Sequence, residues 1–243
     1  MGLEIRVPSY CQYRLASMAK KNPGNSSNSN SNSFSSSETI KTPPPPRSKP
    51  LPLKWTHPIT APEKGSLLVA TEKLDGVRTF ERTVILILRS GTKNPQEGPY
   101  GVIINRPLNK KMKHMNPTNI DLGTKFADYF LHFGGPLMFL LRADETTGLR
   151  GFEEVIPGLY FGSRNSLDEA FGLVKSGARG PRYFRFFMGY AGWQMDQLVE
   201  EIEADCWYVA ACSETLISGI SQNLSTVDLW EEVLGLMGGI IRN

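Results

Sequence analysis

Three arginines lie in or beside apolar segments, where a guanidinium group needs a specific partner. They are Arg82, Arg106 and Arg185. Each presents a rigid fork of N–H donors that matches the geometry of a carboxylate or a phosphate. If the fold brought the three together, they would form an electrostatic clamp on a small anion. No base, nucleophile or metal-ligand set accompanies them in the sequence. An anion-binding enzyme is therefore the alternative here, and a non-enzymatic binding protein is favoured.

A second feature is the glycine-rich segment that joins an aromatic strand to a helix, with Gly189, Gly192 and Trp193. Small residues at such a turn let another backbone approach closely, and a helix N-terminus presents free N–H groups to an anion. A tight structural turn packed under Trp193 explains the same residues. Arg185, which precedes this turn, could likewise pair with a carboxylate instead of a ligand.

The leading hypothesis is a binding or regulatory protein that acts through one surface built from separated strand ends. Its ligand would be an unidentified protein partner or a small anion. The candidate site comprises Arg82, Asn105, Arg106, Gly134, Gly135, Arg185, Gly189, Gly192 and Trp193.

The signatures of common enzyme and metal sites are missing from the sequence. There is no P-loop, no G-x-G-x-x-G, no H-E-x-x-H, no G-x-S-x-G and no paired C-x-x-C, so no catalytic residue, metal or cofactor is predicted. The three histidines are far apart along the chain. Cys206 and Cys212 flank an apolar strand, which would place both on one face but too far apart for a disulfide.

The elements that must position these residues follow from hydrophobic pattern and turn residues. Short apolar runs predict strands at residues 66–70, 83–89, 100–105, 183–190 and 207–211. Ser166 and Glu169 form a capping box for a helix that ends near Gly177. A second helix is predicted over 194–204, and a third runs from a cap at Ser225 to Gly238. Strands grouped early and helices grouped late indicate an α+β fold.

Composition and charge divide the chain near Glu63. Residues 1–62 are rich in Ser, Asn and Pro, which predicts a disordered arm, whereas residues 63–241 have the pattern of one folded domain. The arm holds eight basic and two acidic residues, a net charge of +6. Because the whole chain carries +3, the remaining residues 63–243 carry −3. An acidic domain argues against direct DNA binding. No apolar run approaches the roughly 20 residues that span a membrane.

The arm has two interpretations that the sequence leaves open. It is Ser-rich, basic and poor in acidic residues, as organelle transit peptides are. Glu4 and the absence of early Ser or Thr enrichment favour a plain cytosolic tail. Chloroplast and cytoplasmic locations are thus both consistent with it.

Several ordered motifs together resemble the AlgH/YqgE family. The matching segments are residues 65–71, 80–88, 101–108, Phe133-Gly-Gly-Pro136, 157–162, 185–193 and 229–239. The Ser/Pro-rich arm and the segment 210–213 resemble the plant members. The resemblance implies an α+β arrangement of coiled, partly barrel-like, mostly antiparallel sheets with helices packed outside. Bacterial members of the family are often labelled transcriptional regulators, which is the third functional hypothesis after a binding protein and an anion-binding enzyme. The family supplies no catalytic residues. This chain departs from it in a shorter loop after Pro136 and a shorter C-terminus.

Overall fold

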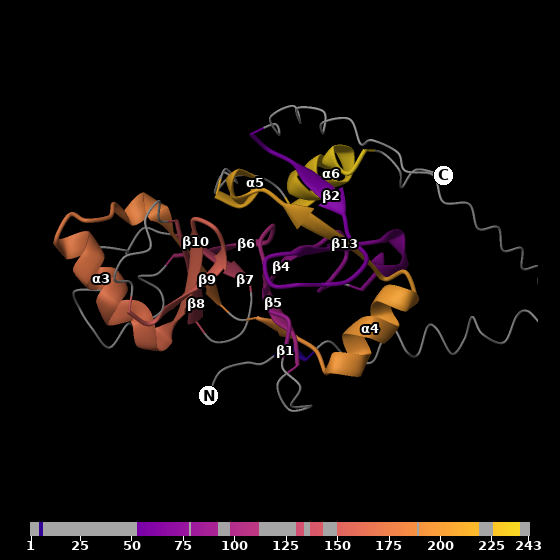
Figure 1. The fold of residues 1–243 in the computed structure, drawn as a ribbon, viewed down its shortest axis with the longest axis horizontal. Helices are drawn as coiled ribbons and strands as arrows, with labels where there is room; N and C mark the ends of the chain where they lie inside the picture. Colours follow the sequence, from indigo (N-terminus) through magenta and orange to yellow (C-terminus); the bar gives the residue numbers. More distant parts are fainter. Residues whose placement is uncertain are drawn as a thin grey trace, which may run out of the picture.

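The chain folds into two β-sheets with helices around them (Figure 1). The computed structural model describes residues 5–6, 53–77, 79–91, 98–111, 130–133, 137–142, 150–188, 190–218 and 226–238. Three short 3-10 helices punctuate these ranges: η2 (Glu72–Leu74), η4 (Arg164–Ser166) and η5 (Pro181–Tyr183).

The central strands of the first sheet carry apolar runs that are buried on both faces. Its order is β1 (Ile5–Arg6), β12 (Ala191–Gly192), β5 (Tyr100–Ile103), β4 (Val84–Arg89), β3 (Leu67–Ala70), β13 (Trp207–Cys212) and β2 (Thr56–Pro58). All neighbours are antiparallel except β1 and β12. The central strands β3 and β4 are almost wholly buried, which explains why their sequences lack a polar alternation.

The chain enters the second sheet directly after β5. Its order is β6 (Pro107–Lys111), β7 (Phe130–Phe133), β11 (Phe184–Met188), β8 (Leu137–Arg142), β10 (Leu159–Ser163) and β9 (Phe152–Ile156). Only β7 and β11 are parallel. The chain crosses back to the first sheet between β11 and β12. Both sheets are open, and mostly antiparallel pairing with outer helices confirms the predicted α+β class.

The helices seal three hydrophobic clusters. The largest cluster lies between the sheets and is closed by α5 (Glu214–Ser218) and α6 (Thr226–Leu236). The opposite face of the first sheet packs on α4 (Met195–Glu203), and that of the second packs on α3 (Leu167–Lys175). Figure 1 shows α5 and α6 above the junction of the sheets, with α3 and α4 at opposite ends. No helix in the described ranges is long and apolar enough to cross a membrane.

The predicted strands and the helices over 166–177 and 194–204 are present, but two details were wrong. Ser166 makes no side-chain cap for α3, because its hydroxyl donates to the carbonyl of Gly151 instead. Cys206 and Cys212 are not joined in a disulfide, and they lie on opposite faces of the first sheet, not on one face. The reason is that Cys206 precedes β13 and follows Asp205, whose φ of 54° turns the chain before the strand begins. Ser225, the predicted cap of α6, lies outside the described residues.

Part of the range that the sequence assigns to the arm lies on the first sheet. Strand β2 pairs with β13, and the backbones of Trp55 and Ser213 are joined by a 2.9 Å hydrogen bond from Ser213 N to Trp55 O. Ile5 and Arg6 pair with β12. Residues on the N-terminal side of the predicted boundary at Glu63 therefore already pair with strands of the first sheet.

Candidate functional site

The structure brings Arg82, Asn105 and Arg106 together where β4 begins and β5 has ended. Asn105 is buried, accepts a 2.8 Å hydrogen bond from Val84 N and donates one of 2.8 Å to Arg82 O. Arg106 donates from Nη2 to Glu81 O at 2.7 Å. Burial lowers the pKa of Arg106, and the nearby Glu81 partly opposes this. The side chains of Asn105 and Arg106 therefore hold the turn that leads into β4.

Arg82 occupies an unusual backbone conformation in this corner. Its φ is 51°, in the left-handed region that side chains other than glycine rarely adopt. Its guanidinium lies 5.5 Å from the ring centre of Trp230 on α6, a cation–π contact. Trp230 is fixed in turn by a 2.8 Å hydrogen bond from its indole to Ala70 O. The corner therefore joins β3, β4 and α6.

Gly192 and Trp193 lie at the other end of β5 from Asn105. Gly192 pairs with Tyr100, and Trp193 N donates to Pro99 O at 3.0 Å. The Trp193 ring is buried under α4 and donates to Glu201. Of the remaining predicted site residues, Gly134, Gly135 and Gly189 lie outside the described residues.

Arg185 lies on β11 in the second sheet and lines a different feature. It is two residues from Phe187, which belongs to the cluster between the sheets, so both side chains face that interior. Arg185 Nη1 donates to Ile217 O of α5 at 3.3 Å. Beside it is a pocket of about 250 Å³. The lining residues are Leu140, Arg142, Leu159, Arg182, Tyr183, Phe184, Arg185 and Ser218. They include neither Arg82 nor Arg106.

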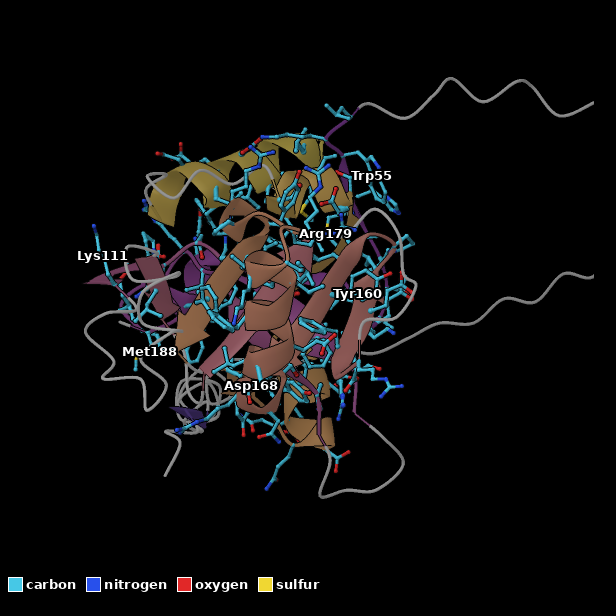
Figure 2. All side chains as sticks on the ribbon, turned by 90° about the vertical axis from the view of Figure 1, so that its left-hand side faces the viewer. Trp55, Lys111, Tyr160, Asp168, Arg179 and Met188 are labelled. Atoms are coloured by element: carbon cyan, nitrogen blue, oxygen red, sulfur yellow. The ribbon has the colours of Figure 1, made fainter. Side chains whose placement is uncertain are left out.

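The pocket lies where β8, β10 and β11 meet α5. Strand pairing sets Arg185 opposite Leu140 and Arg142 opposite Leu159, so residues far apart in sequence share one floor. Figure 2 looks onto the outer face of this sheet, with α3 across it. The pocket is at the Phe184 end of β11. Met188, which is labelled in Figure 2, is at the opposite end of that strand.

Three guanidinium groups give the pocket a surplus of positive charge. Arg142 Nε lies 3.1 Å from Glu214 Oε1, an ion pair at the start of α5. The Arg182 guanidinium lies 5.2 Å from the ring centre of Tyr183. Burial lowers the pKa of Arg185 to about 10, which still leaves it charged at neutral pH. A buried guanidinium beside an open pocket favours an anion there, since the anion restores the electrostatic stabilisation that water supplied.

Of the three arginines that line the pocket, the sequence-based prediction included Arg185 but not Arg142 or Arg182. Arg182 stands three residues before Arg185, just ahead of the aromatic strand. Arg142 is the last residue of the apolar strand β8. It lies two residues after Leu140, so both residues are on the same face of the sheet. These arginines come to one pocket only because β8 pairs with β11, which the sequence alone does not reveal.

Comparison with known proteins adds a family and a fold. The sequence model of a family described as AlgH-like matches residues 67–242. A UPF0301 protein of Chlorobium chlorochromatii is 34% identical over 158 residues, which cover 63% of this chain and 77% of that protein. A UPF0301 protein of Bacteroides fragilis is 29% identical over 182 residues, which cover 73% and 84%.

Among solved structures, the solution structure of the AlgH protein from Pseudomonas aeruginosa is similar, with a TM-score of 0.54 and 19% sequence identity. The match covers 79% of this chain and 92% of that one. At this identity the similarity shows a shared fold.

Proposed function

The chain belongs to the AlgH-like family, and we propose that it is a non-enzymatic binding protein that holds a small anion in the arginine-lined pocket between the second sheet and α5. The observation that carries this proposal is the convergence of Arg142, Arg182 and Arg185 on one open pocket. Three guanidinium groups against the single carboxylate of Glu214 leave a net positive charge for a ligand to neutralise.

The chemistry of the lining supports binding over catalysis. Besides the arginines it offers the hydroxyls of Tyr183 and Ser218 and the apolar surfaces of Leu140 and Leu159. These groups can donate hydrogen bonds to an oxyanion and pack against a short carbon skeleton. Among the lining residues in the described part of the chain there is no imidazole, thiol or carboxylate that would serve as a general base.

The size of the pocket restricts the ligand class. The pocket volume of about 250 Å³ is slightly below the range of typical small-molecule sites, which begins at roughly 300 Å³. Inorganic phosphate or a small carboxylate or phosphate ester fits this description. Arginine forks suit both chemistries because each presents two parallel N–H donors.

Titration calorimetry with inorganic phosphate tests the proposal, with sodium chloride at matched ionic strength as the reference. The variant is Arg182→Gln, which removes one exposed guanidinium from the rim of the pocket. We expect phosphate to bind about tenfold more weakly to it, since a charge-assisted hydrogen bond is worth about 1.5–3 kcal/mol and an exposed site realises the lower end. Arg164→Gln is the matched control, an exposed arginine on η4 outside the lining. Equal loss in both variants, or no phosphate binding by the unsubstituted chain, would contradict the proposal.

A further inference from the structure

Helix α5 is held by the pocket arginines near both of its ends. At its start, Glu214 Oε1 lies 3.1 Å from Arg142 Nε. At its end, Ile217 O accepts a hydrogen bond from Arg185 Nη1 at 3.3 Å, and Ser218 lines the pocket itself. The guanidinium groups that would bind an anion are thus the ones that hold this short helix.

The contact at the start of α5 is poorly aligned. Glu214 Oε1 is buried, yet its approach to Arg142 does not have the geometry of a hydrogen bond. The Arg142 side chain is 44% exposed, whereas that of Glu214 is 16% exposed. Arg142 can therefore turn towards an anion in the pocket, and Glu214 would then be left beside a new negative charge.

The same turn of α5 holds the segment of residues 53–58, which we call the junction segment. Ser213 Oγ accepts a 3.1 Å hydrogen bond from Trp55 N, and Ser213 N donates to Trp55 O at 2.9 Å. The Thr215 hydroxyl donates to Leu53 O and contacts Ser213 Oγ. Leu216 N also donates to Ser213 Oγ. Ser213 and Thr215 flank Glu214, so a shift of Glu214 reaches the junction segment through adjacent residues.

We propose that an anion in the arginine-lined pocket loosens the first turn of α5 and thereby releases the junction segment from the first sheet. This inference rests on the proposed function, since it requires an anion in that pocket. Binding and release are coupled because Arg142 cannot pair fully with both Glu214 and the ligand. In the absence of anion, Glu214 keeps Arg142 and the junction segment stays docked.

The packing of α5 limits the movement to its first turn. Leu216 and Ile217 are each 1% exposed in the cluster between the sheets, which anchors the rest of the helix. The residues that can shift are Ser213, Glu214 and Thr215, and of these Ser213 and Thr215 carry the contacts to the junction segment. A local opening of this kind is detected by hydrogen exchange without unfolding of the domain.

Other contacts hold the junction segment independently of the pocket. Lys54 Nζ forms a 2.8 Å ion pair with Glu232 on α6. The Thr56 hydroxyl donates to Ala211 O at 2.8 Å. Removing the Lys54 pair should loosen the segment without changing its response to an anion, which supplies a matched control.

The experiment is hydrogen exchange on the full chain, with and without saturating inorganic phosphate at constant ionic strength. We expect exchange to become about fivefold faster in peptides covering residues 53–58 and 213–215, the lower end of usual coupling between sites. Peptides covering β4 should not change. Calorimetry on the same samples reports whether phosphate is bound.

Two variants separate the coupling from binding. Glu214→Gln should already exchange fast in the junction segment, bind phosphate more tightly and show no further response to it. Glu232→Gln should exchange faster at rest and still accelerate about fivefold with phosphate, as expected of a change outside the coupled pair. Bound phosphate with unchanged or slower exchange in the junction segment would overturn the coupling alone. Absence of phosphate binding would overturn both the coupling and the proposed function.

Discussion

Trp193 and Trp207 donate from their indole N–H groups to the same carboxylate oxygen, Oε2 of Glu201, at 3.0 and 2.8 Å. The two rings meet edge to face, with centres 6.1 Å apart. Gln197 donates to the other oxygen, Oε1, at 2.9 Å. Glu201 is only 2% exposed. One buried carboxylate therefore joins α4 to β13 and to the residue that follows β12, and this organises the turn that contains Gly192.

Replacing Glu201 with leucine should destabilise the domain strongly. Two buried indole N–H groups would lose their acceptor, at about 1–3 kcal/mol each. Glu201→Gln should cost much less, because the amide oxygen still accepts from both indoles. Urea unfolding followed by tryptophan fluorescence measures both variants. Equal losses of stability in the two would show that the shared acceptor is not what stabilises this contact.

The stability of the domain should carry a pH dependence that comes from Glu201. Burial raises the pKa of this carboxyl above its ordinary value, although the hydrogen bonds from Trp207, Gln197 and Trp193 oppose the shift. The folded state thus keeps the proton to higher pH than the unfolded chain does. The contribution of Glu201 is present below the unfolded pKa of about 4.5 and is lost as pH rises through the folded pKa.

This dependence is measured as the difference between the unsubstituted chain and Glu201→Gln. Titration of all other groups is common to both proteins and cancels in the difference. We expect the unfolding free energy of the unsubstituted chain, relative to the variant, to decrease as pH rises from 4.5. A difference that stays constant with pH, or that increases, would contradict the raised pKa.

The corner around Asn105 carries a prediction about the turn before β4. Asn105→Ala would leave Val84 N and Arg82 O without these side-chain partners in a buried position, at a cost of about 2–4 kcal/mol. Arg82→Gly should be close to neutral. Glycine relieves the left-handed backbone by about 1 kcal/mol, and the lost contact with Trp230 is worth a similar amount. Denaturant unfolding distinguishes them, and a large loss in Arg82→Gly would assign the corner's stability to the guanidinium.

The elements of the first sheet could be predicted because their signal is local. Strands β3 and β4 are continuous apolar runs bounded by turn residues, and α4 shows its polar and apolar faces in sequence. Strand β9 gave no such signal, since Glu153 and Glu154 are adjacent on an edge strand in which only Val155 is deeply buried. Gly65 is a second case in which the sequence does not show why the residue is needed. Its φ of 86° and close approach to Ile156 require glycine, but that contact depends on how the sheets pack.

The candidate site was harder to predict because its members meet only through strand pairing. Arg142 and Arg185 stand on β8 and β11, and the register that sets Arg185 opposite Leu140 brings them together. Arg82 and Arg106 were chosen for the same charge, yet they bind neighbouring backbone and ring groups at the start of β4. Residue type thus indicates the chemistry, whereas the register decides which arginines share a pocket.

The thiol of Cys212 should be unreactive in the folded protein. Burial raises its pKa to about 12, and its Sγ lies 3.8 Å from Gly65 O. Alkylation by iodoacetamide at pH 8 should therefore require unfolding, and mass spectrometry of the native chain should find Cys212 unmodified. The linked effect on stability has a defined sign. The unfolded chain releases this proton near pH 9 and the folded one near pH 12, so stability falls as pH rises across that interval. Rapid native alkylation would contradict the burial of this thiol.

Anion binding should weaken at high pH because of Arg185. Burial lowers its pKa to about 10, so its charge is lost well below the pH at which an exposed arginine deprotonates. A bound anion favours the charged form, and the affinity should fall as pH rises through about 10, by up to tenfold per pH unit well above it. Sulfate is the suitable probe, since its own charge does not change in this range, and calorimetry from pH 8 to 10.5 gives the profile. Tyr183→Phe removes the phenol from the lining and should leave the decline in place, whereas Arg185→Gln should bind weakly with a flatter profile. A decline that disappears in Tyr183→Phe would assign the titration to the phenol and remove Arg185 from the binding site.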